Sequence, residues 1–381
     1  MNRRSLITKG KALARRAGLL VSNHTDREVF RNNFLKEFSY TNRMVKSLGH
    51  PRVYQLETTN HCPYRCGMCP RTHAMTRELG QMDFGLFRAI LDQINPIWQV
   101  DVVGEKPALA LWHFGEPMVY KHFVESIHYC HSRGLRAVLS TNPSSWTRHR
   151  IEEILEAGVD EMYVMFDGMD DETSMAVRGP VASFQRGYAN FMTLLERRAQ
   201  LGSDRPVLNV CMVKQPKNMH QWKMFEDHWK TVSGVQNVEM GGLSTFGGDV
   251  DQLVTISNTL AGQDPNHVKD LARYREMSKY PCYYPWFSFS VTWDGKAVPC
   301  CRDHNASLVF GDLNKESLES IWNGPAIQEL RRQFIEKRVT AAPCVTCRES
   351  SAEIGLPGYY YPVSLINAKR VLARLSGSRY P

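Results

Sequence analysis

Residues 59–70 read Thr-Asn-His-Cys-Pro-Tyr-Arg-Cys-Gly-Met-Cys-Pro and follow a strand-like segment at residues 53–58. The cysteines Cys62, Cys66 and Cys69 have the spacing C-x3-C-x2-C. A four-iron cluster normally takes four cysteine ligands, so three closely spaced thiolates would leave one iron free to bind a small molecule. The stretch therefore predicts a three-cysteine iron–sulfur site. A zinc site is the alternative, because the neighbouring His61 could supply a fourth ligand.

Strand-like and helix-like segments alternate after this stretch. Repeated strand–helix units form parallel sheets with right-handed crossovers, so the pattern predicts an α/β fold. The strand-like segments are residues 53–58, 108–114, 136–140, 161–166, 207–213 and 237–241, and the helical ones include residues 84–94, 123–132, 148–157, 184–200 and 220–232.

A second pattern begins near Cys282. Residues 287–293 and 296–301 are strand-like and flank Asp294-Gly295, a dipeptide that favours a tight hairpin turn. A helix is predicted over residues 318–337, and a C-x2-C pair, Cys344 and Cys347, follows it. With Cys282 and Cys300 this pair gives four cysteines, enough to ligate a whole cluster. Zinc is again the alternative, because paired thiolates also bind zinc.

The first cysteine triplet resembles that of the radical S-adenosylmethionine (SAM) enzymes. The resemblance implies a [4Fe–4S] cluster held by Cys62, Cys66 and Cys69, with SAM on its open iron. Electron transfer from this cluster then yields a 5'-deoxyadenosyl radical that removes hydrogen from a substrate. The six strand–helix units likewise resemble the partial, TIM-like (β/α)6 barrel of these enzymes, with its chemistry at the carboxyl ends of the strands.

Several shorter segments match the SAM-binding motifs of that family. Phe114-Gly115-Glu116-Pro117 resembles the family's Gly-Gly-Glu-Pro, with the first glycine replaced, and implies acceptors for the SAM ammonium. Ser140-Thr141-Asn142 implies contacts with the ribose or methionine, and Arg178 implies a pair with the SAM carboxylate. Met68 stands where an aromatic residue commonly meets adenine, and its thioether can fill the same apolar contact.

The second cysteine set resembles the shortened "twitch" form of the SPASM domain. That resemblance implies one auxiliary [4Fe–4S] cluster bound by Cys282, Cys300, Cys344 and Cys347. It extends to radical SAM dehydrogenases with a twitch domain, and so implies oxidation with the auxiliary cluster as electron acceptor. The expected substrate is a sugar, an aminocyclitol or a nucleotide-linked sugar, and the expected electron donor is a flavodoxin- or ferredoxin-type protein.

Oxidation of a carbinol carbon also needs a proton acceptor. His113, Asp167, Lys214 and Glu239 lie at predicted strand ends and are the candidates. Cys211 could instead return a hydrogen atom, which would favour epimerisation. Dehydration, decarboxylation and peptide modification remain alternatives. Cys130 is interpreted as a core residue, and Cys301 as a residue facing away from Cys300 or substituting for a ligand.

The composition of the 381-residue chain is that of a globular protein, with 43% hydrophobic and 23% charged residues. It has no apolar run that could span a bilayer. Ten cysteines without a secretory signal favour metal chemistry in a reducing cytoplasm. Nothing indicates nucleic-acid binding. Residues 1–20 carry six basic residues and no acid, so they could contact an anionic membrane surface or form a solvated arm.

These patterns divide the chain into five expected parts. They are a basic extension (1–50), the barrel (51–250), a linker (251–281), the auxiliary cluster domain (282–353) and a tail (354–381) in which Tyr359, Tyr360 and Tyr361 could close the cavity or pack at an interface.

Overall fold

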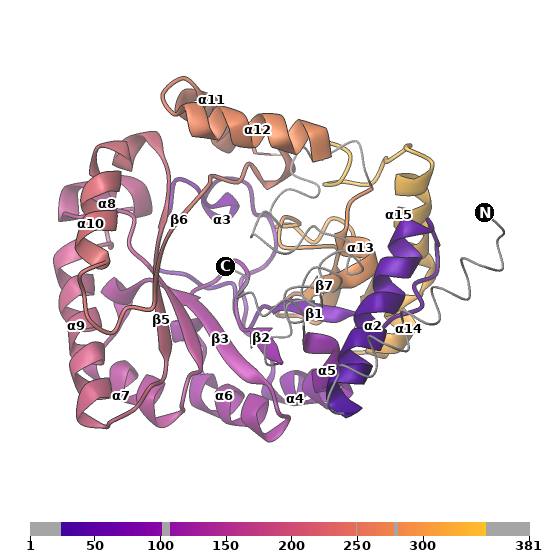
Figure 1. Cartoon of the computed structure of the whole chain (residues 1–381), viewed down its shortest axis with the longest axis horizontal. Coiled ribbons are helices and arrows are strands. Elements are labelled where there is room, and N and C mark those ends of the chain that lie inside the picture. The colour runs from indigo at the N-terminus through magenta and orange to yellow at the C-terminus, as the bar shows by residue number, and fades with distance from the viewer. Residues whose placement is uncertain (1–23, 101–106, 249, 278–280, 348–381) are drawn as a thin grey trace, which may run out of the picture.

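The computed structural model of the chain describes residues 24–100, 107–248, 250–277 and 281–347, and its strands join in one sheet (Figure 1). The spatial order of the strands is β6-β5-β4-β3-β2-β1-β7-β8-β9. The strands are β1 (Arg52–Leu56), β2 (Ala108–Ala110), β3 (Arg136–Thr141), β4 (Glu161–Met165), β5 (Val207–Val213), β6 (Asn237–Gly241), β7 (Ser288–Val291), β8 (Lys296–Val298) and β9 (Gly311–Asp312).

The first six strands form the predicted partial barrel. Each of β1 to β5 pairs in parallel with the next strand, up to β6. The helices between them are α3 (Pro70–His73), α4 (Phe84–Gln93), α5 (Pro96–Gln99), α6 (Phe123–Ser132), α7 (Arg148–Glu156), α8 (Asp171–Arg178), α9 (Phe184–Gln200) and α10 (Trp222–Trp229), with 3-10 turns η1 (Pro117–Val119), η2 (Pro143–Ser145) and η3 (Pro216–Gln221). All six predicted strands are present, so the α/β fold class is confirmed.

Alternation along the strands explains how the barrel packs. On β5, Leu208, Val210 and Met212 are fully buried in the hydrophobic core. The residues between them, such as Asn209 and Cys211, face the opposite side of the sheet. The outer helices α7, α9 and α10 cover the apolar side (Figure 1). The inner side therefore carries the polar groups available for chemistry.

The auxiliary region continues the barrel sheet. Strand β7 pairs in parallel with β1, with Val53 opposite Phe289 and Leu56 opposite Val291. The predicted hairpin is present as antiparallel β7 and β8, and Gly295 turns it with a φ of +86°. The region that the sequence predicts as a small second domain is joined to the barrel by the backbone hydrogen bonds between β1 and β7.

Three further helical regions surround this joint. They are α2 (His24–Thr41), which precedes β1; η4 (Phe246–Gly248), α11 (Asp251–Ala261) and α12 (Pro265–Met277), which follow β6; and α13 (Tyr284–Phe287), α14 (Leu318–Trp322) and α15 (Pro325–Ile335) in the auxiliary region. The segment predicted as a linker is therefore largely helical. The helix predicted over residues 318–337 is wrong as a single element, because Gly324 and Pro325 end α14 and start α15.

Two expectations fall outside the described residues: the basic arm at residues 1–20 and the tail with Tyr359, Tyr360 and Tyr361. Across the residues that are described, none of the helices combines the length and the apolar character that crossing a membrane requires.

Arg331 on α15 fastens the auxiliary region together. Its guanidinium is buried and donates hydrogen bonds to the carbonyl oxygens of Pro285 (2.8 Å), Val45 (3.0 Å) and Trp322 (3.0 Å). It also lies over the Trp322 ring, 4.6 Å from the centroid. Burial lowers the pKa of Arg331 to about 9. One side chain thus joins α15 to α13, to α14 and to the segment before β1.

Replacing Arg331 by Met should lower the free energy of unfolding by about 3 kcal/mol or more, because several buried carbonyl groups lose their donor. Urea unfolding followed by circular dichroism measures the loss. Arg332→Met is the matched control, since Arg332 is half-exposed and pairs with Glu329 on the same helix. It should cost no more than about 0.5 kcal/mol. Equal losses in the two variants would contradict the role of Arg331.

Candidate functional site

The Cys62–Cys69 loop leaves the carboxyl end of β1 and forms a compact cluster. Cys66 is buried with Tyr64 and Ala182, and Cys62, Met68 and Cys69 pack against them. Backbone amides of Arg65 and Gly67 donate to the carbonyl oxygens of Arg178 (3.0 Å) and Val177 (2.8 Å) on α8. The structure therefore brings together the three predicted cluster cysteines and Met68.

The three thiols are suited to a positively charged ligand. Burial, with smaller contributions from other thiols of the loop, raises the pKa of Cys62 and of Cys69 to about 12. Burial also raises the pKa of Cys66, whereas the neighbouring Arg178 opposes that shift. Metal ions stabilise thiolates in such surroundings because they replace the protons. The donor set therefore fits an iron–sulfur cluster.

The Phe114–Pro117 segment, which follows β2, lies directly against this loop. The amide of Glu116 donates to the carbonyl oxygen of His61 at 2.9 Å. A Cβ added at Gly115 would lie 2.0 Å from the carbonyl oxygen of Thr59. Only glycine allows this approach of the two backbones, so Gly115 positions the motif beside the cysteine loop. Pro117 begins the short turn η1.

Glu116 links this motif to the end of β3. Its carboxylate accepts hydrogen bonds from the Thr141 hydroxyl (2.5 Å) and from the amides of Asn142 (3.1 Å) and Met118 (3.3 Å). Burial raises the pKa of Glu116 to about 7, although these hydrogen bonds oppose the shift. Ser140, Thr141 and Asn142 thus lie beside the motif predicted to bind SAM. The contacts of these residues with SAM stay predictions.

Arg178 lies at the carboxyl end of α8 and faces the cysteine loop. Its Nε donates to Asp167, and its Nη1 lies 3.5 Å from the Cys66 Sγ. Asp167 also accepts a hydrogen bond from the Val213 amide at 2.7 Å. Both residues are buried. Asp167 therefore holds Arg178 in place, which suits a positioning residue better than a proton acceptor.

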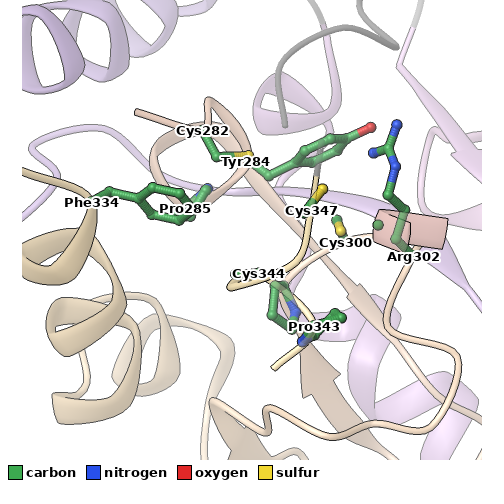
Figure 2. Close-up of a pocket in the computed structure, with 11 residues that line it drawn as sticks. Cys282, Tyr284, Pro285, Cys300, Arg302, Phe334, Pro343, Cys344 and Cys347 are labelled. Atoms are coloured by element: carbon green, nitrogen blue, oxygen red, sulfur yellow. The ribbon is translucent and has the colours of Figure 1, made fainter. Parts of the chain in front are cut away.

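The second cysteine set lines one pocket (Figure 2). Its four cysteines come from three segments: the stretch before α13, the end of the hairpin and the turn after α15. The other lining residues are Gly247, Tyr284, Pro285, Pro299, Arg302, Phe334 and Pro343. The structure thus assembles Cys282, Cys300, Cys344 and Cys347 around a common space.

These four thiols also fit a metal cluster. Burial raises the pKa of Cys300 to about 12 and that of Cys282 still further, and nearby thiols contribute in both cases. The pKa of Cys344 is raised in the same way. No group of three or more His, Cys, Asp or Glu side chains within the described ranges could hold a single metal ion.

The remaining candidates lie at different places. Cys211 on β5 is opposite Glu239 on β6, on the inner side of the sheet. Lys214 instead lies over the Trp222 ring, 4.8 Å from its centroid. His113 is buried 3.8 Å from Glu57, and burial lowers the pKa of His113 to about 4. The structure groups Cys211 with Glu239 and separates Lys214 from them.

The other two cysteines lie outside both sets. Cys130 is fully buried in the hydrophobic core, in agreement with its interpretation. Cys301 is not among the residues that line the four-cysteine pocket, and its Sγ lies 4.0 Å from the Tyr284 hydroxyl.

Sequence reasoning missed Glu57 and Arg77. Glu57 follows β1, is fully buried, and accepts two hydrogen bonds from Arg77, both at 2.8 Å. An acidic residue between an apolar strand and the cysteine motif was the available signal.

Two family descriptions match most of the described chain. Residues 56–227 match the radical SAM superfamily, and residues 282–348 match SPASM, an iron–sulfur cluster-binding domain. These matches imply SAM, a [4Fe–4S] cluster and auxiliary iron–sulfur ligation, in agreement with the two cysteine sets.

Curated relatives share about a quarter of their residues with this chain. A tungsten-containing aldehyde ferredoxin oxidoreductase cofactor-modifying protein of Pyrococcus furiosus is 25% identical, over 77% of this chain and 86% of its own. The PqqA peptide cyclase of Rhodopseudomonas palustris is 24% identical, over 82% and 83%. The SAM-dependent 2-deoxy-scyllo-inosamine dehydrogenase of Niallia circulans is 21% identical, over 79% and 94%.

A solved structure supports the fold. SuiB of Streptococcus suis, crystallised with the precursor peptide SuiA, has a TM-score of 0.55 at 13% identity and covers 80% of this chain and 71% of its own.

The raised pKa of Glu116 predicts a pH-dependent stability. Below pH 4.5, the pKa of Glu116 in the unfolded chain, protonation of Glu116 makes its full contribution to the free energy of unfolding. That contribution is lost as pH rises through about 7, the pKa of Glu116 in the folded protein. The metal-free protein should lose about 3 kcal/mol from this group between those limits. Glu116→Gln should remove that part of the slope in urea unfolding at pH 5, 6, 7 and 8. Parallel slopes in the two proteins would contradict the shift.

Proposed function

Because the chain belongs to the radical SAM superfamily and carries a SPASM-type iron–sulfur domain, we propose that it oxidises a carbinol carbon of a small molecule to a carbonyl. The observation that carries the proposal is the four-cysteine pocket of Cys282, Cys300, Cys344 and Cys347. Four thiolates complete the ligation of a four-iron cluster. Such a cluster has no open iron for SAM and is suited to electron transfer.

The likeness to an aminocyclitol dehydrogenase favours a polyol, an aminocyclitol or a sugar derivative as substrate. When bound, SAM and the three-cysteine cluster supply a 5'-deoxyadenosyl radical that removes one hydrogen atom, and the auxiliary cluster accepts one electron. The substrate must then lose one proton to form the carbonyl. A group of the protein on the inner side of the sheet has to accept it.

Glu239 is the proposed proton acceptor. Glu239 is an exposed residue whose carboxyl is partly shielded from water, and this partial burial together with the nearby Glu161 carboxylate raises the pKa of Glu239, which makes it a stronger base than an unperturbed glutamate. Among the described residues its carboxylate makes no hydrogen bond or ion pair. Asp167 is occupied by Arg178, and Lys214 lies over Trp222. Glu239 is therefore the candidate whose carboxylate is available.

We assign SAM binding to the residues gathered beside the cysteine loop. Glu116 and the backbone of Gly115 and Pro117 would accept from the SAM ammonium, and Arg178 would pair with its carboxylate. Met68 would contact the adenine, and Ser140, Thr141 and Asn142 the ribose or methionine part. Their convergence at the ends of β1, β2 and β3 supports this assignment.

Peptide modification is the second candidate, favoured by the likeness to a peptide cyclase. Epimerisation is the third, and Cys211 is the residue that would support it. Burial raises the pKa of Cys211, so its sulfur keeps the hydrogen that an epimerase would return to carbon.

We further propose that the protein works in the cytoplasm with a flavodoxin- or ferredoxin-type electron donor. All ten cysteines are free thiols in the structure, as a reducing compartment maintains them.

Anaerobic reconstitution should give about eight irons per chain, from two four-iron clusters. Cys66→Ala should abolish 5'-deoxyadenosine formation, because it removes a ligand of the SAM-binding cluster. Cys347→Ala should retain SAM cleavage but stop carbonyl formation. Cys130→Ala is the matched control, since this thiol lies in the core, and it should retain both activities. Full turnover by Cys347→Ala would rule out the auxiliary cluster as electron acceptor.

A deuterium label distinguishes the candidate reactions. With 2-deoxy-scyllo-inosamine deuterated at the oxidised carbon as first probe, a dehydrogenase transfers deuterium to 5'-deoxyadenosine and consumes one SAM per carbonyl. An epimerase instead incorporates solvent hydrogen at that carbon.

Glu239→Gln should slow carbonyl formation by about 100-fold, whereas Glu239→Asp should retain more of the rate. Equal rates for wild type and Glu239→Gln would exclude Glu239 as proton acceptor.

A further inference from the structure

We infer that Glu57, Arg77 and Phe114 form a bridge that fixes the loop after Cys300 against the carboxyl ends of β1 and β2. These three residues, called the bridge below, would set the separation between the two cysteine sites. They are positioning residues, and the inference concerns geometry independently of the substrate.

The ion pair is the first part of the bridge. Both guanidinium Nη atoms of Arg77 donate to Glu57, each at 2.8 Å, and its Nε donates to the carbonyl oxygen of His304 at 2.7 Å. His304 is four residues after Cys300, and Arg77 is eight after Cys69. One planar guanidinium therefore connects the barrel strand, the cysteine loop and the auxiliary loop.

Glu57 also binds the hairpin. Its carboxylate accepts hydrogen bonds from the amides of Trp293 (3.1 Å) and Phe114 (3.4 Å). Trp293 follows β7, and its indole donates to the carbonyl oxygen of Glu78 at 3.3 Å. Buried ion pairs contribute little net stability but can impose one specific arrangement. This pair lies where strand β1, the hairpin and both cysteine loops converge.

Phe114 is the second part of the bridge. It replaces the first glycine of the SAM-binding motif and is buried. Its ring lies 6.3 Å from His304 and 5.7 Å from Phe246, measured between centroids. Phe246 precedes Gly247, at which an added Cβ would lie 3.4 Å from that of Cys347. The ring thus contacts two segments that border the four-cysteine pocket.

Neighbouring hydrogen bonds reinforce the same joint. The Asn305 side chain accepts from the Thr76 amide at 2.7 Å and donates to the carbonyl oxygen of Ala74 at 3.1 Å. Residues 74–77 and 304–305 are therefore fastened to each other directly. Because these segments follow Cys69 and Cys300, a shift of one cysteine site would displace the other.

The test compares Arg77→Lys with Arg197→Lys in the reconstituted holoenzyme. Lysine keeps the charge but cannot form the two-pronged contact. Arg197 also makes a two-pronged contact, through its Nε and one Nη, with Glu152 at 2.8 and 3.2 Å, between α9 and α7 on the outside of the barrel. Two readouts are measured: amide hydrogen exchange of residues 301–308, and the magnetic interaction between the two reduced clusters by electron paramagnetic resonance.

Arg77→Lys should speed amide hydrogen exchange in residues 301–308 about tenfold or more. It should also widen the range of magnetic interaction strengths between the two clusters, with iron content retained. Arg197→Lys should match wild type in both. Phe114→Leu is the second variant, and it should also broaden the interaction. Wild-type exchange and spectra in Arg77→Lys and Phe114→Leu would overturn the inference. Failure of both to fold, with Arg197→Lys folded, would assign the residues to stability alone and would also overturn it.

Neither readout needs a substrate, so they remain decisive if wild type forms no carbonyl product and the proposed oxidation fails. If that oxidation holds, Arg77→Lys should also form severalfold more 5'-deoxyadenosine per carbonyl than wild type.

Discussion

The parallel pairing of β1 with β7 is the constraint on which the rest of the structure depends. The register shifts between the Val53–Phe289 pair and the Leu56–Val291 pair, but the pairing extends beyond β1, where the Glu57 amide donates to the carbonyl oxygen of Val291. The barrel and the auxiliary region therefore share one sheet and cannot move as independent bodies without breaking backbone hydrogen bonds. Because the Cys62–Cys69 loop leaves β1 and the hairpin contains β7, this pairing places the cysteine loop beside the auxiliary region. The buried Glu57 carboxylate, at the end of β1, then joins both to Arg77.

Burial gives both cysteine sites a common property. Thiols that are removed from water and surrounded by one another resist ionisation, so each site favours neutral sulfur until a cation arrives. Iron binding then contributes to folding free energy, since it neutralises groups that the fold has already brought together. Arg178 beside Cys66 supplies some positive charge at the first site, and Arg302 lines the pocket of the second. Both sites therefore bury thiols that resist ionisation, and a different arginine lies near each of them.

Local patterns predicted most of the barrel, and non-local contacts account for what they missed. Side chains that alternate between the two sides of the sheet, as in β4 and β5, leave a pattern in the sequence that indicates a strand and the side that each residue faces. The cysteine spacings likewise predicted both cysteine sites. The break between α14 and α15 has a local signal in Gly324-Pro325. By contrast, the docking of β7 on β1 joins segments more than two hundred residues apart, and no local period encodes that partner. The direction of Lys214 depends on a tertiary contact with Trp222 on the helix that follows β5, and the Glu57–Arg77 pair depends on how the cysteine loop folds back.

The central place of β1 has a consequence for biosynthesis. Among the described strands, β1 emerges from the ribosome first and β2 soon covers one of its edges, but β7 appears only after β2 to β6. Until then, the other edge of β1 exposes unpaired amides and carbonyls to any extended polypeptide nearby. The nascent chain is consequently vulnerable to aggregation until β7 has appeared. A chaperone that shields that edge, or rapid translation of the remaining codons, would raise the yield of native protein.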